Sequence, residues 1–455
     1  MGGEAASVGV SVAEVESQAE GVSGQSRSGQ PPSRNAVVLL VFTAVTNLAD
    51  GVTKIALPLL AAGITSSPAQ ISLVSLALTL PWLLVALHVG VVVDRVDRRR
   101  LLWLADGMRL LAVGGLLAAL AADGIALWGL VVAGVVLGVA EVIALTAAAA
   151  LVPAVVPRAE RERANAWVAG TETVANEFAG PFVGGLLVAA GTGLALGASW
   201  VSYLAASLVL LLLTGRFRAH RGDRTDGAGG AGGVDGADPG GPVEPVAGRG
   251  GRGTVHAEIA EGLRHLWQHR LLRTMALILT VLCASWGAWL ALMPLVATRH
   301  MGLSADQYGI VLSGLGIGGL VGAVTVTRVN RLLGRRWAMF ADLLGTFAMM
   351  AVPAVTTRWW AVAVAAFAGG MGGTLWAVNA RLIGQNLVPE AMMGRYSGVS
   401  RLLSWGALPV GAGLMGVLAQ WCGVRVAFLV FAAAVAATVP VFWRVVTVRA
   451  LRAAE

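Results

Sequence analysis

Long uninterrupted runs of apolar residues dominate this chain, and they limit its possible folds more than any other feature. A helix needs about 20 apolar residues to cross a bilayer core of about 30 Å. Because backbone polar groups inside lipid must bond to one another, runs of this length are predicted to be helices. The runs lie at 36–62, 69–93, 101–122, 125–152, 165–190, 194–215, 272–298, 307–329, 336–355, 359–386, 396–420 and 424–446.

The composition excludes most other classes of protein. Only 13% of the residues are charged, against about 25% in an average soluble domain, so a soluble fold would lack polar surface. The net charge of +8 could suggest nucleic acid, but the arginines lie in short loops between apolar runs, where membrane topology explains them. Cys283 and Cys422 lie in apolar runs without ligand partners nearby, so we expect no disulfide framework, metal site or cofactor.

The arginines occupy every second loop, which indicates the orientation of the chain. Cytoplasmic loops of membrane proteins carry an excess of Lys and Arg. The basic loops hold Arg95, Arg98, Arg99, Arg100, Arg158, Arg161, Arg163, Arg328, Arg331, Arg335 and Arg336, and the last segment holds Arg444, Arg449 and Arg452. The opposite loops hold single arginines at 299, 358 and 425. Both termini are therefore predicted to be cytoplasmic, with the chain in the inner (plasma) membrane.

Composition also divides the chain into segments. The polar first residues lack the basic start and apolar core of a signal peptide. A Gly-, Asp- and Arg-rich stretch separates the two sets of apolar runs and is typical of a flexible linker. We expect a disordered cytoplasmic tail at 1–34, a six-helix bundle at 35–215, a linker at 216–254, an amphipathic interfacial helix at 255–271, a second six-helix bundle at 272–447 and a cytoplasmic tail at 448–455.

The two sets of runs resemble copies of one unit. Leu57-Pro58-Leu59 corresponds to Met293-Pro294-Leu295, and Asp106 corresponds to Asp342, at the same offset along the chain. Paired halves are what a carrier with alternating access needs, because one bundle rocks against the other around a central site. The predicted fold class is an all-α membrane protein with twelve transmembrane helices in two pseudo-symmetric six-helix bundles.

Several stretches carry a resemblance to a known family. The segment from Gly90 to Arg99 (GVVVDRVDRR) resembles the signature of the major facilitator superfamily between its second and third helices, although that signature usually has Gly where Asp97 stands. Gly180-Pro181-Phe-Val-Gly184-Gly185 resembles the fifth-helix motif of the family's antiporters and exporters. Asn176 to Pro181, Gly138 to Glu141 and Arg401 to Pro409 are similar to the branch of enterobactin-type siderophore exporters and actinobacterial efflux carriers. The similarity runs from about 36 to 445.

The resemblance implies two gating elements. The first is a charged cluster that would hold the halves together in the outward-facing state, with Gly90 allowing close helix approach; its residues are Gly90, Asp94, Arg95, Asp97, Arg98 and Arg99, extended by Asp106 and Arg109. The alternative is that these arginines only set topology. The second is a kinked small-residue face that would seal the outer side, formed by Gly180, Pro181, Gly184 and Gly185; the alternative is ordinary close packing.

Ionisable groups at bilayer depth are costly and commonly functional. Asp50 and Lys54 are four residues apart and are predicted to pair on one helix face, either for packing or as a charge pair lining the cavity. The resembling exporters carry an acid at the position of Asp50, whereas Lys54 departs from their pattern. Glu141 and Glu177 have no basic neighbour at helical spacing, so they are the candidates for proton coupling. The alternative is a neutral acid hydrogen-bonded between helices.

Further candidates for substrate or proton coupling are Glu172, Asn176, Trp376, Asn379 and Gln385. The predicted function is export of a small organic molecule (a drug, antibiotic, siderophore or other metabolite) in exchange for protons, by a monomer in the lipid bilayer. Uptake of a nutrient on the same fold is the alternative, and a non-transporting receptor or scaffold is a third. An enzyme and a nucleic-acid partner are not expected, since no phosphate-binding loop or nucleophile–base arrangement is found.

Overall fold

The computed structural model describes residues 34–93, 96–156, 161–213 and 254–452, and within these ranges the regular structure is helical. Eleven of the described helical segments are long and apolar enough to cross a membrane. A shorter apolar helix, α3 (Pro68–Leu84), continues after Val85 as α4 (Ala86–Val93) and completes a set of twelve. The predicted fold class is confirmed. The tail and linker expected at 1–34 and 216–254 fall outside the described residues, apart from Arg34 and Thr254.

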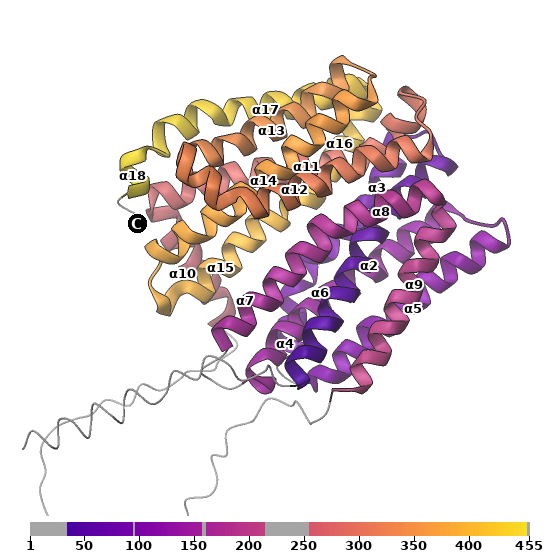
Figure 1. The fold of residues 1–455 in the computed structure, drawn as a ribbon, viewed down its shortest axis with the longest axis horizontal. Coiled ribbons are helices and arrows are strands. Elements are labelled where there is room, and N and C mark those ends of the chain that lie inside the picture. The colour runs from indigo at the N-terminus through magenta and orange to yellow at the C-terminus, as the bar shows by residue number, and fades with distance from the viewer. Residues whose placement is uncertain (1–33, 94–95, 157–160, 214–253, 453–455) are drawn as a thin grey trace, which may run out of the picture.

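The first half of the chain forms one bundle (Figure 1). Its remaining helices are α2 (Arg34–Ile64), α5 (Arg98–Ala121), α6 (Leu127–Val155), α7 (Arg161–Glu172), a π-helical stretch at Thr173–Ala179, α8 (Gly180–Ala190) and α9 (Thr192–Leu211). Helix starts follow from the local sequence: the Ser67 hydroxyl accepts the Gln70 amide at α3, and the Asp97 carboxylate accepts the Arg99 amide at α5 over 2.9 Å. Side chains of this kind satisfy amides that a helix leaves unbonded.

The second half repeats the arrangement in orange to yellow in Figure 1. It comprises α11 (Arg270–Leu295) with a π-helical end at Val296–His300, α12 (Ala305–Leu333), α13 (Arg335–Val355), α14 (Trp359–Leu387), α15 (Glu390–Trp405), α16 (Ala407–Cys422), α17 (Val424–Val445) and the short α18 (Val448–Arg452). A helix is also present as α10 (Thr254–Gln268), where the amphipathic segment is predicted, and it packs against α15 and α11. Its position on a membrane surface stays a prediction.

The two halves pack tightly against each other at one end. There α8 packs against α12 and α3 packs against α16. A β-carbon added at Gly185 would lie 2.6 Å from the carbonyl oxygen of Gly309, and the Ser67 hydroxyl donates to Gln420 Oε1 over 3.1 Å. At the opposite end, where α2 begins and α9 ends, the close packing of α4 and α7 is with elements of the first half. We call these the closed end and the linker end.

Candidate functional site

A buried arginine organises the interior of the first half. Arg109 on α5 is fully buried and donates to Asp106 Oδ1 over 3.0 Å and to the Asp50 carboxylate of α2. The guanidinium lies 5.4 Å from the ring of Tyr203, whose hydroxyl donates to Asp50 over 2.8 Å. Ser207 donates to the other oxygen of Asp106 over 3.2 Å. Asp50 of α2, Asp106 of α5 and Tyr203 of α9 therefore surround one buried cation, and the two carboxylates offset the cost of burying its charge. We call Asp50, Asp106, Arg109 and Tyr203 the arginine cluster.

A second charged group lies further along α2. The Lys54 ammonium is 2.7 Å from Glu141 Oε1 on α6 and donates to Asn176 Oδ1 over 3.1 Å. Asn176 in turn donates to Glu141 over 2.8 Å and to Asn47 over 3.2 Å. The Glu141 side chain is 3% exposed, whereas that of Lys54 is 24% exposed. The lysine therefore connects a buried carboxylate to accessible space. We call Lys54, Glu141 and Asn176 the lysine triad.

The lysine triad depends on an irregularity of the fifth spanning segment. Asn176 lies in the π-helical stretch Thr173–Ala179, where the Gly180 amide bonds to the Ala175 carbonyl five residues back. A π-helical turn is rare and is found mostly at functional sites, because it changes which residues of a helix share a face. The kink that the sequence predicts at Gly180 and Pro181 thus takes the form of a π turn directly before them.

A third group joins the two halves. Arg401 of α15 is 2.7 Å from Glu172 of α7, with 50% and 16% of their side chains exposed. The Arg401 guanidinium lies 5.5 Å from the Trp82 ring and 5.8 Å from the Trp405 ring, and these two rings are 5.1 Å apart. Lys54 lies 5.8 Å from the same Trp405 ring. The tryptophan pair, Trp82 and Trp405, therefore places aromatic faces from both halves next to the lysine triad.

The pairing expected for two of the membrane charges is wrong. The sequence predicts that Asp50 pairs with Lys54, but Asp50 bonds to Arg109 and Lys54 bonds to Glu141. Glu141 has no basic neighbour at helical spacing, and its cation comes from α2 instead. Contacts between helices supply these partners, and helical spacing within one helix cannot reveal them. The Glu177 side chain lies outside what the structure describes, so its role in proton coupling stays a prediction.

The loop motif is only partly brought together. Asp94 and Arg95 lie outside the described residues, while Asp97 caps α5. A β-carbon at Gly90 would meet nothing within 4 Å of the described residues, so the close helix approach expected there is absent in this conformation. Asp106 and Arg109 do not extend a surface cluster with Arg98 and Arg99, since both are fully buried in the arginine cluster.

The fifth-segment motif makes two different contacts. A β-carbon at Gly180 would lie 2.7 Å from the Gly51 α-carbon, and one at Gly184 would lie 3.2 Å from the Val52 α-carbon, so both face α2 of the same half. Gly185 faces Gly309 of α12, and the carbonyl oxygen of Phe182 accepts a 3.5 Å hydrogen bond from Ser313 of the same helix. Pro181 is buried in the first turn of α8. Part of the motif therefore packs within the first half, and part of it contacts the second half.

We expect Gly180→Ala to lower the free energy of unfolding by about 1–3 kcal/mol, because the new methyl group overlaps the α2 backbone. The matched control is Gly170→Ala on α7, where a β-carbon meets nothing within 4 Å. Thermal unfolding of the purified variants in detergent measures the difference. Equal unfolding temperatures for the two variants would contradict the close contact.

The candidates of the second half lie apart from these charges. Trp376 is 1% exposed and packs 6.3 Å from the Phe442 ring in the core of its bundle, so it does not line accessible space in this conformation. Asn379 is fully buried and exchanges hydrogen bonds of 2.9 and 3.1 Å with Asn330. Gln385 is exposed near the end of α14. Asp342, the counterpart of Asp106, accepts a 3.1 Å bond from Thr346.

The sequence does not predict Trp82, Trp405, Tyr203, Ser207 or Arg401 as site residues, although Arg401 and Trp405 lie in the stretch from Arg401 to Pro409 that carries the resemblance. Arg401 offers a further signal, because it stands inside the apolar run at 396–420, as other charges at bilayer depth do. Trp82 and Tyr203 offered none, because an aromatic residue in an apolar run is ordinary core.

Comparison with known proteins agrees with this architecture. The sequence profile of the Major Facilitator Superfamily matches residues 39–326, and that of a family described as transmembrane secretion effector matches residues 250–455. The chain is 27% identical over 412 residues to the multidrug efflux pump Tap of Mycolicibacterium fortuitum, covering 87% of this chain and 92% of that protein. It is 29% identical over 416 residues to Tap of Mycobacterium tuberculosis strain H37Rv, covering 89% and 91%.

Among solved structures, a bacterial homologue of the human lysosomal transporter Spinster, inward-facing and unoccupied, aligns with a TM-score of 0.65. The alignment has 13% identity and covers 94% of this chain and 99% of the other. At this identity the likeness concerns the fold alone. Together with the profile match over more than half of the sequence, it places this chain in the Major Facilitator Superfamily of membrane transporters.

Proposed function

We propose that the protein exports small organic molecules across the plasma membrane by alternating access, in exchange for protons, with both termini in the cytoplasm. The relatives named multidrug efflux pumps cover nearly the whole chain and support export. The observation that carries the mechanism is the lysine triad, in which a buried carboxylate is paired with a lysine that reaches accessible space. The family is one of transporters, so no catalytic role is assigned to these residues.

The charges of the first half support proton exchange. Asp50, Asp106 and Glu141 supply three carboxylates, while Arg109 and Lys54 supply two cations. The surplus carboxylate lies in the arginine cluster, where Asp50 and Asp106 share Arg109, and this cluster is sealed. We assign proton exchange to Glu141 instead, because its cation, Lys54, is partly exposed and connects the carboxylate to accessible space. Protonation of Glu141 weakens its ion pair with Lys54, and deprotonation restores the ion pair.

The tryptophan pair supports an amphiphilic organic substrate. Two indole rings 5.1 Å apart offer apolar area and the negative faces that attract cations. Arg401 and Lys54 occupy positions over these rings, and Glu172 stands beside them. An organic cation with an apolar body would replace these side chains over the rings and pair with the carboxylates that they leave.

The direction and the coupling can be tested together in proteoliposomes. Protease protection of the termini determines the orientation of the transporter in the liposomes. When the compartment opposite the termini is made acidic, a fluorescent organic cation should accumulate in that compartment. Collapse of the pH gradient by an ionophore should stop this accumulation. Accumulation on the side of the termini under the same gradient would instead support the uptake alternative, and accumulation that survives the ionophore would remove proton coupling.

We expect Trp405→Ala to raise the concentration of organic cation needed for half-maximal transport by about 3- to 30-fold, the value of a cation–π contact. The matched control is Trp421→Ala on α16, an indole that is 83% exposed and outside the site. Trp405→Phe should retain most of the affinity, because it keeps an aromatic face. A Trp405→Ala variant with unchanged half-saturation would exclude the tryptophan pair from the substrate site.

A further inference from the structure

A buried carboxyl group in the second half has no part in the transport site described above. Asp342 belongs to the spanning helix α13, about 10 Å along the helix from Arg335 at a rise of about 1.5 Å per residue. The residue is 2% exposed, and its described hydrogen bond is the one of 3.1 Å that the Thr346 hydroxyl donates. Ionisable groups inside a membrane are costly and commonly functional, so the charge of Asp342 needs an explanation.

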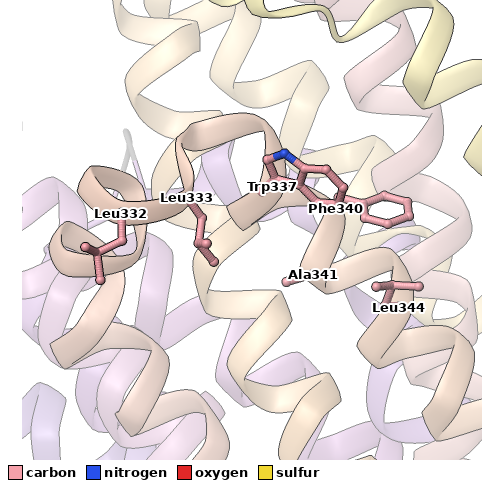
Figure 2. A pocket seen from close by; sticks show the side chains of 6 residues that line it. All are labelled: Leu332, Leu333, Trp337, Phe340, Ala341 and Leu344. Atoms are coloured by element: carbon pink, nitrogen blue, oxygen red, sulfur yellow. The ribbon is translucent and has the colours of Figure 1, made fainter.

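Asp342 lies on the inner face of α13. The outer face carries an apolar surface groove (Figure 2), and the residues of α13 that line it are Trp337, Phe340, Ala341 and Leu344. Because a helix turns once in about 3.6 residues, Asp342 faces the other way, as do Met339 and Thr346, which are fully buried. A β-carbon added at Gly372 of α14 would lie 2.5 Å from the Asp342 α-carbon, so α14 covers this face closely. The carboxyl group is therefore enclosed between helices, away from the groove.

The first half neutralises the corresponding carboxylate in a way that the second half cannot. Asp106 pairs with Arg109, one turn further along α5. At the same offset along the chain, Arg109 corresponds to Gly345, where a β-carbon would overlap the carbonyl oxygen of Ala368 on α14. A side chain at this position would push α13 and α14 apart. The second half therefore keeps the acid without the arginine.

The helices packed against α13 do not supply a cation to Asp342 either. These helices are α11, α12, α14, α17 and α18. On them and on α13 itself, the charged and titratable side chains that the structure describes are Arg270, Arg273, Cys283, Tyr308, Arg328, Arg331, Arg335, Arg336, Arg381, Arg425, Arg444 and Arg449. Most of these arginines are exposed near helix ends. Within this described set, no group forms an ion pair with Asp342.

We propose that Asp342 is a second proton-binding site, whose carboxyl group holds a proton in this conformation. An ionised carboxylate enclosed without a cation is costly, and a bound proton removes that cost by making the group neutral. A neutral carboxyl group can still accept the bond from Thr346. The site lies on α13 of the second half, so it depends neither on proton exchange at Glu141 nor on the direction of transport.

The bound proton makes the packing of the second half sensitive to pH. An accessible aspartate loses its proton above about pH 4, whereas the enclosed one keeps its proton while α13 and α14 stay packed. The folded protein then holds one proton more than the unfolded chain, so the free energy of unfolding falls as the pH rises. The fall amounts to about tenfold in the folding equilibrium constant per pH unit, until the enclosed group also ionises.

Infrared spectroscopy of the full-length protein in nanodiscs tests the protonation directly. A protonated carboxyl group has a carbonyl band distinct from the bands of a carboxylate, and Asp342→Asn removes whichever of these belongs to this residue. At neutral pH we expect the spectrum of the wild type minus that of Asp342→Asn to contain the band of a protonated acid, which shifts in heavy water. The matched control is Asp123→Asn, at an exposed position between α5 and α6, which should remove carboxylate bands instead.

Unfolding in detergent as a function of pH provides the second measurement. Between about pH 5 and pH 7, the folding equilibrium constant of the wild type relative to that of Asp342→Asn should fall by about tenfold per pH unit, because asparagine has no proton to lose. Glu141→Gln should keep the acid band of Asp342, so a failure of proton exchange at Glu141 leaves this site in place. Carboxylate bands in the Asp342→Asn difference spectrum, or a stability ratio that does not change with pH, would overturn the proposal.

Discussion

Arg109→Leu is expected to leave the protein largely unfolded in detergent, with the free energy of unfolding lowered by about 3–5 kcal/mol. The substitution removes the guanidinium but leaves Asp50 and Asp106 facing each other in a sealed interior. Loss of one partner of a buried ion pair has this magnitude because the remaining charge has no compensation. Size-exclusion profiles and thermal unfolding of the purified variant measure the loss.

Compensating substitutions separate the charge effect from lost packing. Asp50→Asn and Asp106→Asn added to Arg109→Leu should restore much of the folded fraction, since no uncompensated charge then remains. Arg299→Leu, at an exposed position near the end of α11, should have little effect. If Arg109→Leu unfolds at the wild-type temperature, the arginine cluster does not hold the first half together.

Glu141→Gln is expected to reduce proton-driven accumulation of substrate to the level of protein-free liposomes. Glutamine keeps the size of the side chain and can still accept a bond from Lys54, but it cannot take up and release a proton. Substrate exchange at equal pH on both sides should persist, because alternation with substrate bound does not need the proton. Gradient-driven accumulation and exchange at equal pH, measured together, therefore distinguish the loss of proton coupling from the loss of alternating access.

Matched substitutions test the assignment among the carboxylates. Glu141→Asp should retain gradient-driven accumulation at a reduced rate, since it keeps an ionisable group. Glu172→Gln removes a carboxylate that we propose to pair with the substrate, so we expect a higher half-saturating concentration, while gradient-driven accumulation continues. Uphill transport by Glu141→Gln at the wild-type rate would show that another group exchanges the proton. Glu177→Gln would then be the next variant to measure.

The spanning segments could be predicted closely from the sequence, because lipid imposes a length and a composition on each of them. The run predicted at 424–446 forms α17 at 424–445, and the run at 359–386 forms α14 at 359–387. The charged residues could also be found, since a charge at bilayer depth stands out from its neighbours. Their partners could not, because Lys54 and Glu141 lie 87 residues apart and meet only after helices pack.

Other parts of the site lay beyond sequence reasoning for a different reason. The π-helical stretch at Thr173–Ala179 has no composition of its own, and the register of Asn176 depends on it. Trp376 and Trp405 are both tryptophans within apolar runs, yet Trp376 lies in the core and Trp405 lies beside Lys54. The orientation of each helix within its bundle decides which indole faces accessible space, and the residue pattern along one helix does not contain that information.

The fifth spanning segment is held at its two ends by different parts of the molecule. On one side of the π-helical stretch, α8 packs against α12 of the second half, and on the other side α7 packs against α2 and α6 of the first half. Asn176 lies in the π-helical stretch between these two contacts, and its amide bonds to both Lys54 and Glu141. Under the proton exchange that we propose, a rotation of α8 with the second half would therefore shift this amide and change the electrostatic environment of the Glu141 carboxylate.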